Sequence, residues 1–195
     1  FDAIRGNISE IKTLASLCGT QEKNSGNMAV SDTMDVEKIT DKSDHCGKIT
    51  GIDGSGRGVD ADNADTVTEE NLAQHISNAK MLSKKLQTIV AITGAIDLVT
   101  DGSSCYVIRN GNPQMEHVTG AGCQLSGILT AFLAANPENK LQAAAAAVCM
   151  MGYAGELAAE KSGQSGSGTY RVSLMDAVSC MDGDILERGA RYEIR

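Results

Sequence analysis

Val118-Thr119-Gly120-Ala121-Gly122-Cys123 stands directly before an apolar run, Gln124 to Ala135, that has the length and composition of a helix. Glycines let a backbone approach a ligand closely, and the N–H groups and positive dipole end of the following helix favour an anion. Cys123 falls in the first helical turn, where a thiol is most easily ionised. The stretch therefore predicts an anion site between a loop and a helix. The alternative is a tight turn whose glycines only relieve backbone strain.

The segments on both sides of this stretch alternate between strand and helix patterns, which predicts an α/β fold. We expect strands at residues 1–4, 88–93, 98–100, 105–109 and 114–118, and helices at residues 9–17, 71–86, 123–135, 140–161 and 173–181. A strand that follows directly on a helix, as at residues 88–93, is typical of a layered fold with a mainly parallel sheet flanked by helices. The short strands after it are typical of a meander at a sheet edge. We expect Ser173 to cap the last helix.

Composition and charge exclude several classes of protein. The net charge is −8, with 17 Lys and Arg against 25 Asp and Glu, which argues against a nucleic-acid surface or an anionic-membrane surface. The longest apolar tract, residues 141–153, is too short to span a bilayer. Six cysteines without a Cys-x-x-Cys pair fit reduced thiols in the cytoplasm. The chain begins with Phe1, so we expect it to be the C-terminal part of a longer polypeptide.

Two further strand ends carry groups suited to a phosphate or a metal. Arg5 follows the first expected strand and can clamp phosphate oxygens, while Glu10 in the next helical turn can reach a metal or its water shell. Thr93 ends another strand, where ligands usually bind in an open α/β sheet. The alternative is that Ser9 caps the helix, Glu10 complements its dipole, Arg5 is solvated and Thr93 begins an ordinary turn.

Four ordered motifs resemble the signature segments of the hydroxyethylthiazole kinases, a family of thiamine-salvage enzymes with the ribokinase-like fold. The resemblance covers most of residues 1–17 and 56–195. The motifs are Arg5-Gly6-Asn7-x-Ser9-Glu10, Gly58-Val59-Asp60, Thr93-Gly94-x-x-Asp97-x-Val99-Thr100-Asp101-Gly102 and Val118-Thr119-Gly120-x-Gly122-Cys123.

The resemblance implies transfer of the ATP γ-phosphoryl group to the hydroxyl of 4-methyl-5-(2-hydroxyethyl)thiazole. By that resemblance Arg5 and Thr93 bind the ATP phosphates, and Glu10 helps to hold Mg²⁺. It also implies a homotrimer with a small-molecule substrate.

The resemblance further implies roles for the stretch at residues 118–123. Gly120, Ala121 and Gly122 would form the anion hole, with Gly120 also beside the thiazole. Cys123 stands where related sugar kinases carry an aspartate base, and phosphoryl transfer can proceed with a weak base because it mainly needs positioning and charge neutralisation. A different ribokinase-like kinase, for hydroxymethylpyrimidine or a sugar, is the alternative, but we would expect aspartate at position 123 in it.

The chain also departs from the family pattern. The family's N-terminal portion is missing, so residues 1–195 correspond to the C-terminal two-thirds of a kinase domain and are expected to lack a complete substrate site. The polar segment at about 18–55 is a long insertion and is similar to insertions in fungal forms that are fused behind a thiamine-phosphate synthase. A truncated, non-catalytic chain that acts by association is a further alternative, because missing strands would expose a sheet edge and an apolar face.

Overall fold

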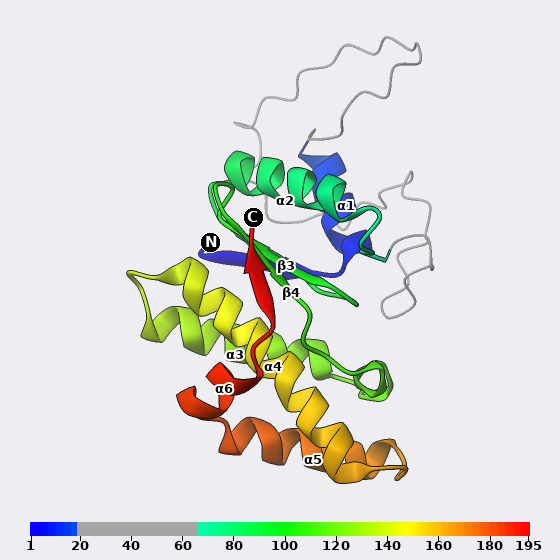
Figure 1. The fold of residues 1–195 in the computed structure, drawn as a ribbon. Coiled ribbons are helices and arrows are strands. Elements are labelled where there is room, and N and C mark those ends of the chain that lie inside the picture. The colour runs from blue at the N-terminus through cyan, green and yellow to red at the C-terminus, as the bar shows by residue number, and fades with distance from the viewer. Residues whose placement is uncertain (19–65) are drawn as a thin grey trace, which may run out of the picture.

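A five-stranded sheet lies between two layers of helices (Figure 1). The computed structural model describes residues 1–18 and 66–195, so all but the first residue of the expected insertion at 18–55 lies outside the described residues. The elements are β1 (Ala3–Gly6), α1 (Ile8–Leu17), α2 (Leu72–Leu86), β2 (Ile89–Ile92), β3 (Asp97–Thr100), β4 (Cys105–Ile108), η3 (Pro113–His117), α3 (Ala121–Ala135), α4 (Lys140–Ser162), α5 (Ser167–Cys180), α6 (Gly183–Gly189) and β5 (Tyr192–Ile194).

The strands follow the order β1-β2-β3-β4-β5. β1 is parallel to β2, whereas the next three pairs are antiparallel. The expected α/β layers are therefore confirmed, but the pairing of the described strands differs from a mainly parallel sheet. The physical reason is that four-residue turns join β2 to β3 and β3 to β4, and a parallel crossover needs a dozen or more residues. The parallel pair brings the carboxyl ends of β1 and β2 to one edge, with Gly6 opposite Ile92.

Helices α1 and α2 cover one face of the sheet (Figure 1). The apolar positions of α2 repeat at helical spacing, and Leu72, Ile76 and Leu82 are all buried there. They pack with Val90 and Leu98 from the sheet in one core cluster.

Helix α4 forms the centre of the opposite layer, where it contacts β2, β3, β4, α3 and α5. It has the length and hydropathy of a membrane span, but 67% of that apolar window is buried inside the structure, as in a core helix of a globular domain. Small side chains allow the close packing: a Cβ on Gly152 would lie 2.6 Å from the carbonyl oxygen of Asn110.

The strand expected at residues 114–118 is wrong, because this segment forms the 3₁₀ helix η3. The Asn112 side chain accepts a hydrogen bond from the Gln114 N–H at 3.0 Å, which caps the first turn. Pro113 at the first helical position has its φ fixed near the helical value. These two local interactions outweigh the weak strand pattern.

Ser173 is not a helix cap as expected, because α5 begins six residues earlier and Ser173 is buried within it. Tyr170 explains the longer helix: its ring is buried and its hydroxyl donates to the Gly155 carbonyl of α4 at 3.0 Å. Helix α6 and strand β5 are absent from the expected elements. β5 pairs with β4, and Arg109 beside it bonds Glu193 at 2.8 Å.

Candidate functional site

The ends of β1 and β2 place two of the predicted residues together. Arg5 Nη1 lies 3.5 Å from Thr93 Oγ1, although 88 positions separate them in the sequence. The parallel pairing continues one residue past the strands, since the Thr93 N–H donates to the Gly6 carbonyl at 3.0 Å. The guanidinium and the hydroxyl therefore lie at the same edge of the sheet, as the sequence predicted.

The first turn of α3 follows a glycine cap. Gly120 has φ 91°, in the left-handed region that glycine tolerates, and it offers no side-chain acceptor to the helix. The Ala121 N–H already donates to the Val118 carbonyl at 3.1 Å. This bond engages Ala121, one of the three residues expected to form the anion hole, whereas the N–H groups of Gly122 and Cys123 in the same first turn have no acceptor within the helix and suit an anion. The Cys123 side chain itself is exposed.

Arg5 lies against this first turn of α3. A Cβ added to Gly122 would lie 3.2 Å from both Arg5 Nη1 and Arg5 Nη2, so the absence of a side chain at position 122 lets the guanidinium approach the helix. Arg5 Nε is buried and has no hydrogen-bond partner among the described residues. A guanidinium, a helix N-terminus and a hydroxyl therefore converge, and all three can donate hydrogen bonds to phosphate oxygens.

Glu10 belongs to a capping box that begins α1. Its Oε2 accepts from the Asn7 N–H at 2.8 Å, and its own N–H donates to Asn7 Oδ1 at 2.9 Å. The cap is therefore Asn7 and not Ser9. Glu10 also lies beside the end of β1, since a Cβ on Gly6 would be 3.0 Å from Glu10 Oε2.

The side chains at this edge suit Mg²⁺, which also takes ligands from phosphate and water, better than they suit a metal ion held by protein ligands alone. Across residues 1–18 and 66–195, no group of three or more His, Cys, Asp or Glu side chains could hold a metal ion. Mg²⁺ is commonly bound through one or two carboxylates, with phosphate oxygens and waters completing its shell. The Glu10 carboxylate, with one oxygen engaged in the cap, suits that single contribution.

Asp97 also lies at this edge of the sheet, although the sequence alone predicted no role for it. It begins β3, is only 8% exposed, and its Oδ1 accepts from the Gly94 N–H at 2.8 Å. Burial raises the pKa of Asp97 to about 7, although the Gly94 hydrogen bond and the charge of Arg5 act in the opposite direction. The only feature of the sequence that indicates a buried acid is the position of Asp97 directly before the apolar pair Leu98-Val99, in the motif that begins with Thr93-Gly94.

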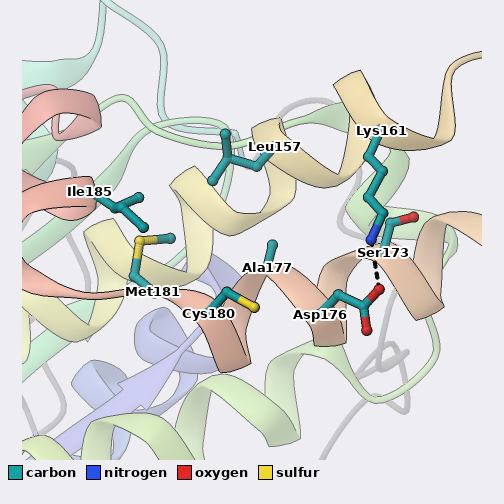
Figure 2. A pocket seen from close by; sticks show the side chains of 8 residues that line it. All are labelled: Leu157, Lys161, Ser173, Asp176, Ala177, Cys180, Met181 and Ile185. Carbon is teal, nitrogen blue, oxygen red and sulfur yellow. Dashed lines mark hydrogen bonds and ion pairs between the residues drawn. The ribbon is translucent and has the colours of Figure 1, made fainter.

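A separate apolar hollow of about 200 Å³ lies between α4, α5 and α6. Figure 2 shows its eight lining side chains, with the Lys161–Asp176 ion pair at one end, where Nζ and Oδ2 are 2.7 Å apart. The residues named above at the ends of β1 and β2 and at the start of α3 do not line it. It is therefore distinct from the candidate phosphate site.

Comparison with known proteins connects this geometry to one family. The model of a family described as hydroxyethylthiazole kinase family matches residues 32–184. The chain is 41% identical to a hydroxyethylthiazole kinase of Clostridium acetobutylicum, over 99% of the chain and 58% of that protein. It is 33% identical to hydroxyethylthiazole kinase 2 of Methanosphaera stadtmanae, over 99% of the chain and 58% of that protein.

A solved structure shares the fold. It is that of the hydroxyethylthiazole kinase protein from Pyrococcus horikoshii OT3, with a TM-score of 0.68 and 21% identity over 100% of this chain and 55% of that one. The chain thus spans somewhat more than half the length of the relatives it matches.

Proposed function

The chain belongs to the hydroxyethylthiazole kinase family, and on that premise we propose that the protein phosphorylates the hydroxyl of 4-methyl-5-(2-hydroxyethyl)thiazole with ATP. The observation that carries the proposal is the position of the Arg5 guanidinium, which faces the first turn of α3 at Gly122 with the Thr93 hydroxyl beside it. Phosphoryl transfer depends mainly on positioning and on neutralising charge, and this edge of the sheet provides donors for both.

In this proposal Arg5 and Thr93 bind phosphate oxygens of ATP. The N–H groups of Gly122 and Cys123 stabilise the negative charge that develops on the transferred group, and the bonded Ala121 N–H fixes the turn that presents them. Gly120, the N-cap of α3, lies beside the thiazole in this proposal, and a Cβ added there would meet no atom within 4 Å.

Glu10 contributes one carboxylate oxygen to Mg²⁺. When bound, the ion neutralises phosphate charge and orients the phosphoryl group. The capping box keeps Glu10 at the end of β1 independently of the metal, because Asn7 bonds both its backbone N–H and its Oε2.

Cys123 is the residue that we propose to face the acceptor hydroxyl, since its side chain is exposed in the first turn of α3. Replacing Cys123 with Asp restores the carboxylate that related sugar kinases carry. We expect Cys123→Asp to keep or raise the turnover number. A well-folded but inactive variant would remove Cys123 from this role.

The direct test is ATP-dependent phosphorylation of hydroxyethylthiazole by the full-length gene product, followed by mass spectrometry. A product heavier by one phosphoryl group, formed only with ATP, supports the proposal. Binding of ATP without phosphorylation of the thiazole would instead indicate another acceptor alcohol. The same assay with hydroxymethylpyrimidine or a sugar tests the alternative kinases.

We also propose a cytoplasmic homotrimer. All five cysteines among the described residues are unpaired, as is usual in a reducing compartment. The trimer rests on membership of the family, and light scattering of the purified gene product measures it. From the similarity of the segment at about 18–55 to insertions in fungal forms, we also propose a fusion to thiamine-phosphate synthase, which the mass of the full-length product tests.

A further inference from the structure

Asp97 is the only carboxylate buried among the described residues, and the proposed reaction does not use it. It begins β3, next to β2, the strand that Thr93 follows. An ionised carboxyl group in such a place is costly unless another group compensates its charge.

One hydrogen bond and one charge interaction connect Asp97 to the site. Its Oδ1 accepts from the Gly94 N–H at 2.8 Å and so holds the turn that follows Thr93. The positive charge of Arg5 acts on it across the adjoining strands and favours its ionised form. Asp97 thus holds the turn directly and reaches Arg5 through Thr93, whose Oγ1 lies 3.5 Å from Arg5 Nη1.

Arg5 cannot compensate two negative groups equally well. While the phosphate site is empty, the guanidinium stabilises the carboxylate of Asp97. When phosphate oxygens bind Arg5, they neutralise its charge, and a proton on Asp97 then replaces the lost compensation. Cys149 of α4, a described residue, also interacts with the charge of Asp97; burial raises the pKa of that thiol to about 12, so it stays neutral.

We propose that Asp97 is a positioning residue that holds the Thr93–Gly94 turn, and with it the Thr93 hydroxyl that bonds Arg5, and that it takes up one proton from solvent when nucleotide phosphate binds. The inference rests on the proposed function, because it requires a phosphate ligand at Arg5. It assigns Asp97 no contact with the substrate or with the reacting atoms.

The test is isothermal titration calorimetry of Mg·ATP into the full-length protein, in buffers with different heats of ionisation, from about pH 6 to about pH 8.5. The variants are Asp97→Asn, which keeps an oxygen acceptor for the Gly94 N–H but cannot ionise, and Asp97→Ala, which loses both. Asp101→Asn is the matched control, because Asp101 caps the turn at the other end of the same strand and is exposed.

We expect the wild-type protein and Asp101→Asn to take up roughly half a proton or more per nucleotide near pH 7.5, beyond the uptake of Asp97→Asn. Because binding is coupled to proton uptake, the wild-type Kd should rise with pH above about 7, by up to roughly tenfold per unit. This excess dependence should vanish in Asp97→Asn. Asp97→Ala should bind more weakly than Asp97→Asn at every pH, since it also loses the turn.

Each outcome decides between the two proposals. Equal proton counts in the wild-type protein and Asp97→Asn overturn the role of Asp97 and leave the kinase proposal standing. Equal affinities of Asp97→Asn and Asp97→Ala overturn the positioning of the turn. Absence of ATP binding to the wild-type protein overturns the kinase proposal and this inference together. If Asp97→Asn does not fold, the wild-type protein alone still tests the role of Asp97. Proton uptake on binding that exceeds the uptake by the nucleotide itself supports that role, and its absence overturns it.

Discussion

At the start of β3 the Asp97 carboxyl group accepts one backbone N–H, that of Gly94, and is buried beside the charge of Arg5. Just past the other end of β3 the Asp101 carboxylate accepts three hydrogen bonds on Oδ1, from the N–H and hydroxyl of Ser103 and from the N–H of Ser104, and is exposed. The same side chain therefore caps a turn at each end of one four-residue strand, in opposite surroundings.

The surroundings move the two pKa values in opposite directions. Burial raises the pKa of Asp97 to about 7. For Asp101 burial also acts to raise the pKa, but the hydrogen bonds from Ser104 and Ser103 outweigh it and hold the pKa below its usual value. The turn at Asp101, which only ends a strand, therefore stabilises the ionised carboxylate. At the candidate phosphate site, only the Gly94 N–H and the charge of Arg5 act against the burial of the acid, and Arg5 Nε has no hydrogen-bond partner among the described residues.

The two ends of β3 should differ most in how the free energy of unfolding depends on pH. The folded-state pKa of Asp97 is raised, so its contribution to stability is fully present below the unfolded-state value, near 4, and is lost as the pH rises through about 7. Asp97→Asn cannot lose a proton, so its stability should gain on the wild-type protein by about 1.4 kcal/mol per pH unit between these limits. The gain should total on the order of 4 kcal/mol above pH 7.

Urea unfolding at a series of pH values measures this difference. The change of the difference with pH is the readout, because a constant cost of the new amide cancels in it. Parallel curves for the two proteins would show that Asp97 does not ionise in the folded state over this range.

The next effect is on nucleotide binding. Arg5→Ala removes the guanidinium from the first turn of α3, and hydrogen bonds to charged groups contribute about 1.5–3 kcal/mol, so the Kd for ATP should rise roughly 10- to 100-fold. It also removes the charge that lowers the pKa of Asp97, so that pKa should move further upward. Arg171→Ala, at an exposed position of α5, is the control. Unchanged ATP kinetics in Arg5→Ala would remove Arg5 from the site.

The sequence predicted the elements that their own residues determine. The apolar spacing of α2 and α4 placed both helices within a residue or two of their bounds, because buried faces repeat along the helix. The start of α5 was missed because its Gly- and Ser-rich beginning has no helical pattern, and the burial of Tyr170 against α4 stabilises it instead. β5 was missed because it is three residues long and pairs with β4, a strand that lies far away in the sequence, with Val107 opposite Glu193.

The site divides in the same way. Arg5 and Thr93 were predicted from their positions at strand ends, and the glycines of residues 120–122 from their place before a helix. Asp97 could not be predicted, since its burial and its proximity to Arg5 arise only when β1, β2 and β3 lie side by side. The capping box was missed because the Asn7–Glu10 pair and Ser9 are equally plausible caps in the sequence.

A smaller effect is expected from Gly122→Ala. The new methyl group would lie 3.2 Å from both Arg5 Nη atoms, so the flexible end of Arg5 moves while the helix remains intact. We expect the Kd for ATP to rise by about 3- to 10-fold, corresponding to roughly 1 kcal/mol. Gly127→Ala in the same helix is the matched control, because nothing lies within 4 Å of its Cβ and it should bind ATP normally. Normal ATP binding by Gly122→Ala as well would place the phosphates away from Arg5.

The smallest effect is expected at the other end of β3, and it should have the opposite sign. The folded-state pKa of Asp101 is lowered, so its contribution is present above the ordinary aspartate pKa, near 4, and is lost as the pH falls below that value. Asp101→Asn keeps an acceptor for the turn and loses only a charge that solvent screens, so it should cost less than about 1 kcal/mol at neutral pH. Urea unfolding should show its stability approaching that of the wild-type protein as the solution is acidified. The opposite result would be that Asp101→Asn becomes more stable relative to the wild-type protein as the pH rises, as expected for Asp97→Asn. The pKa values of both aspartates would then be shifted in the same direction, and the contrast between the ends of β3 would fail.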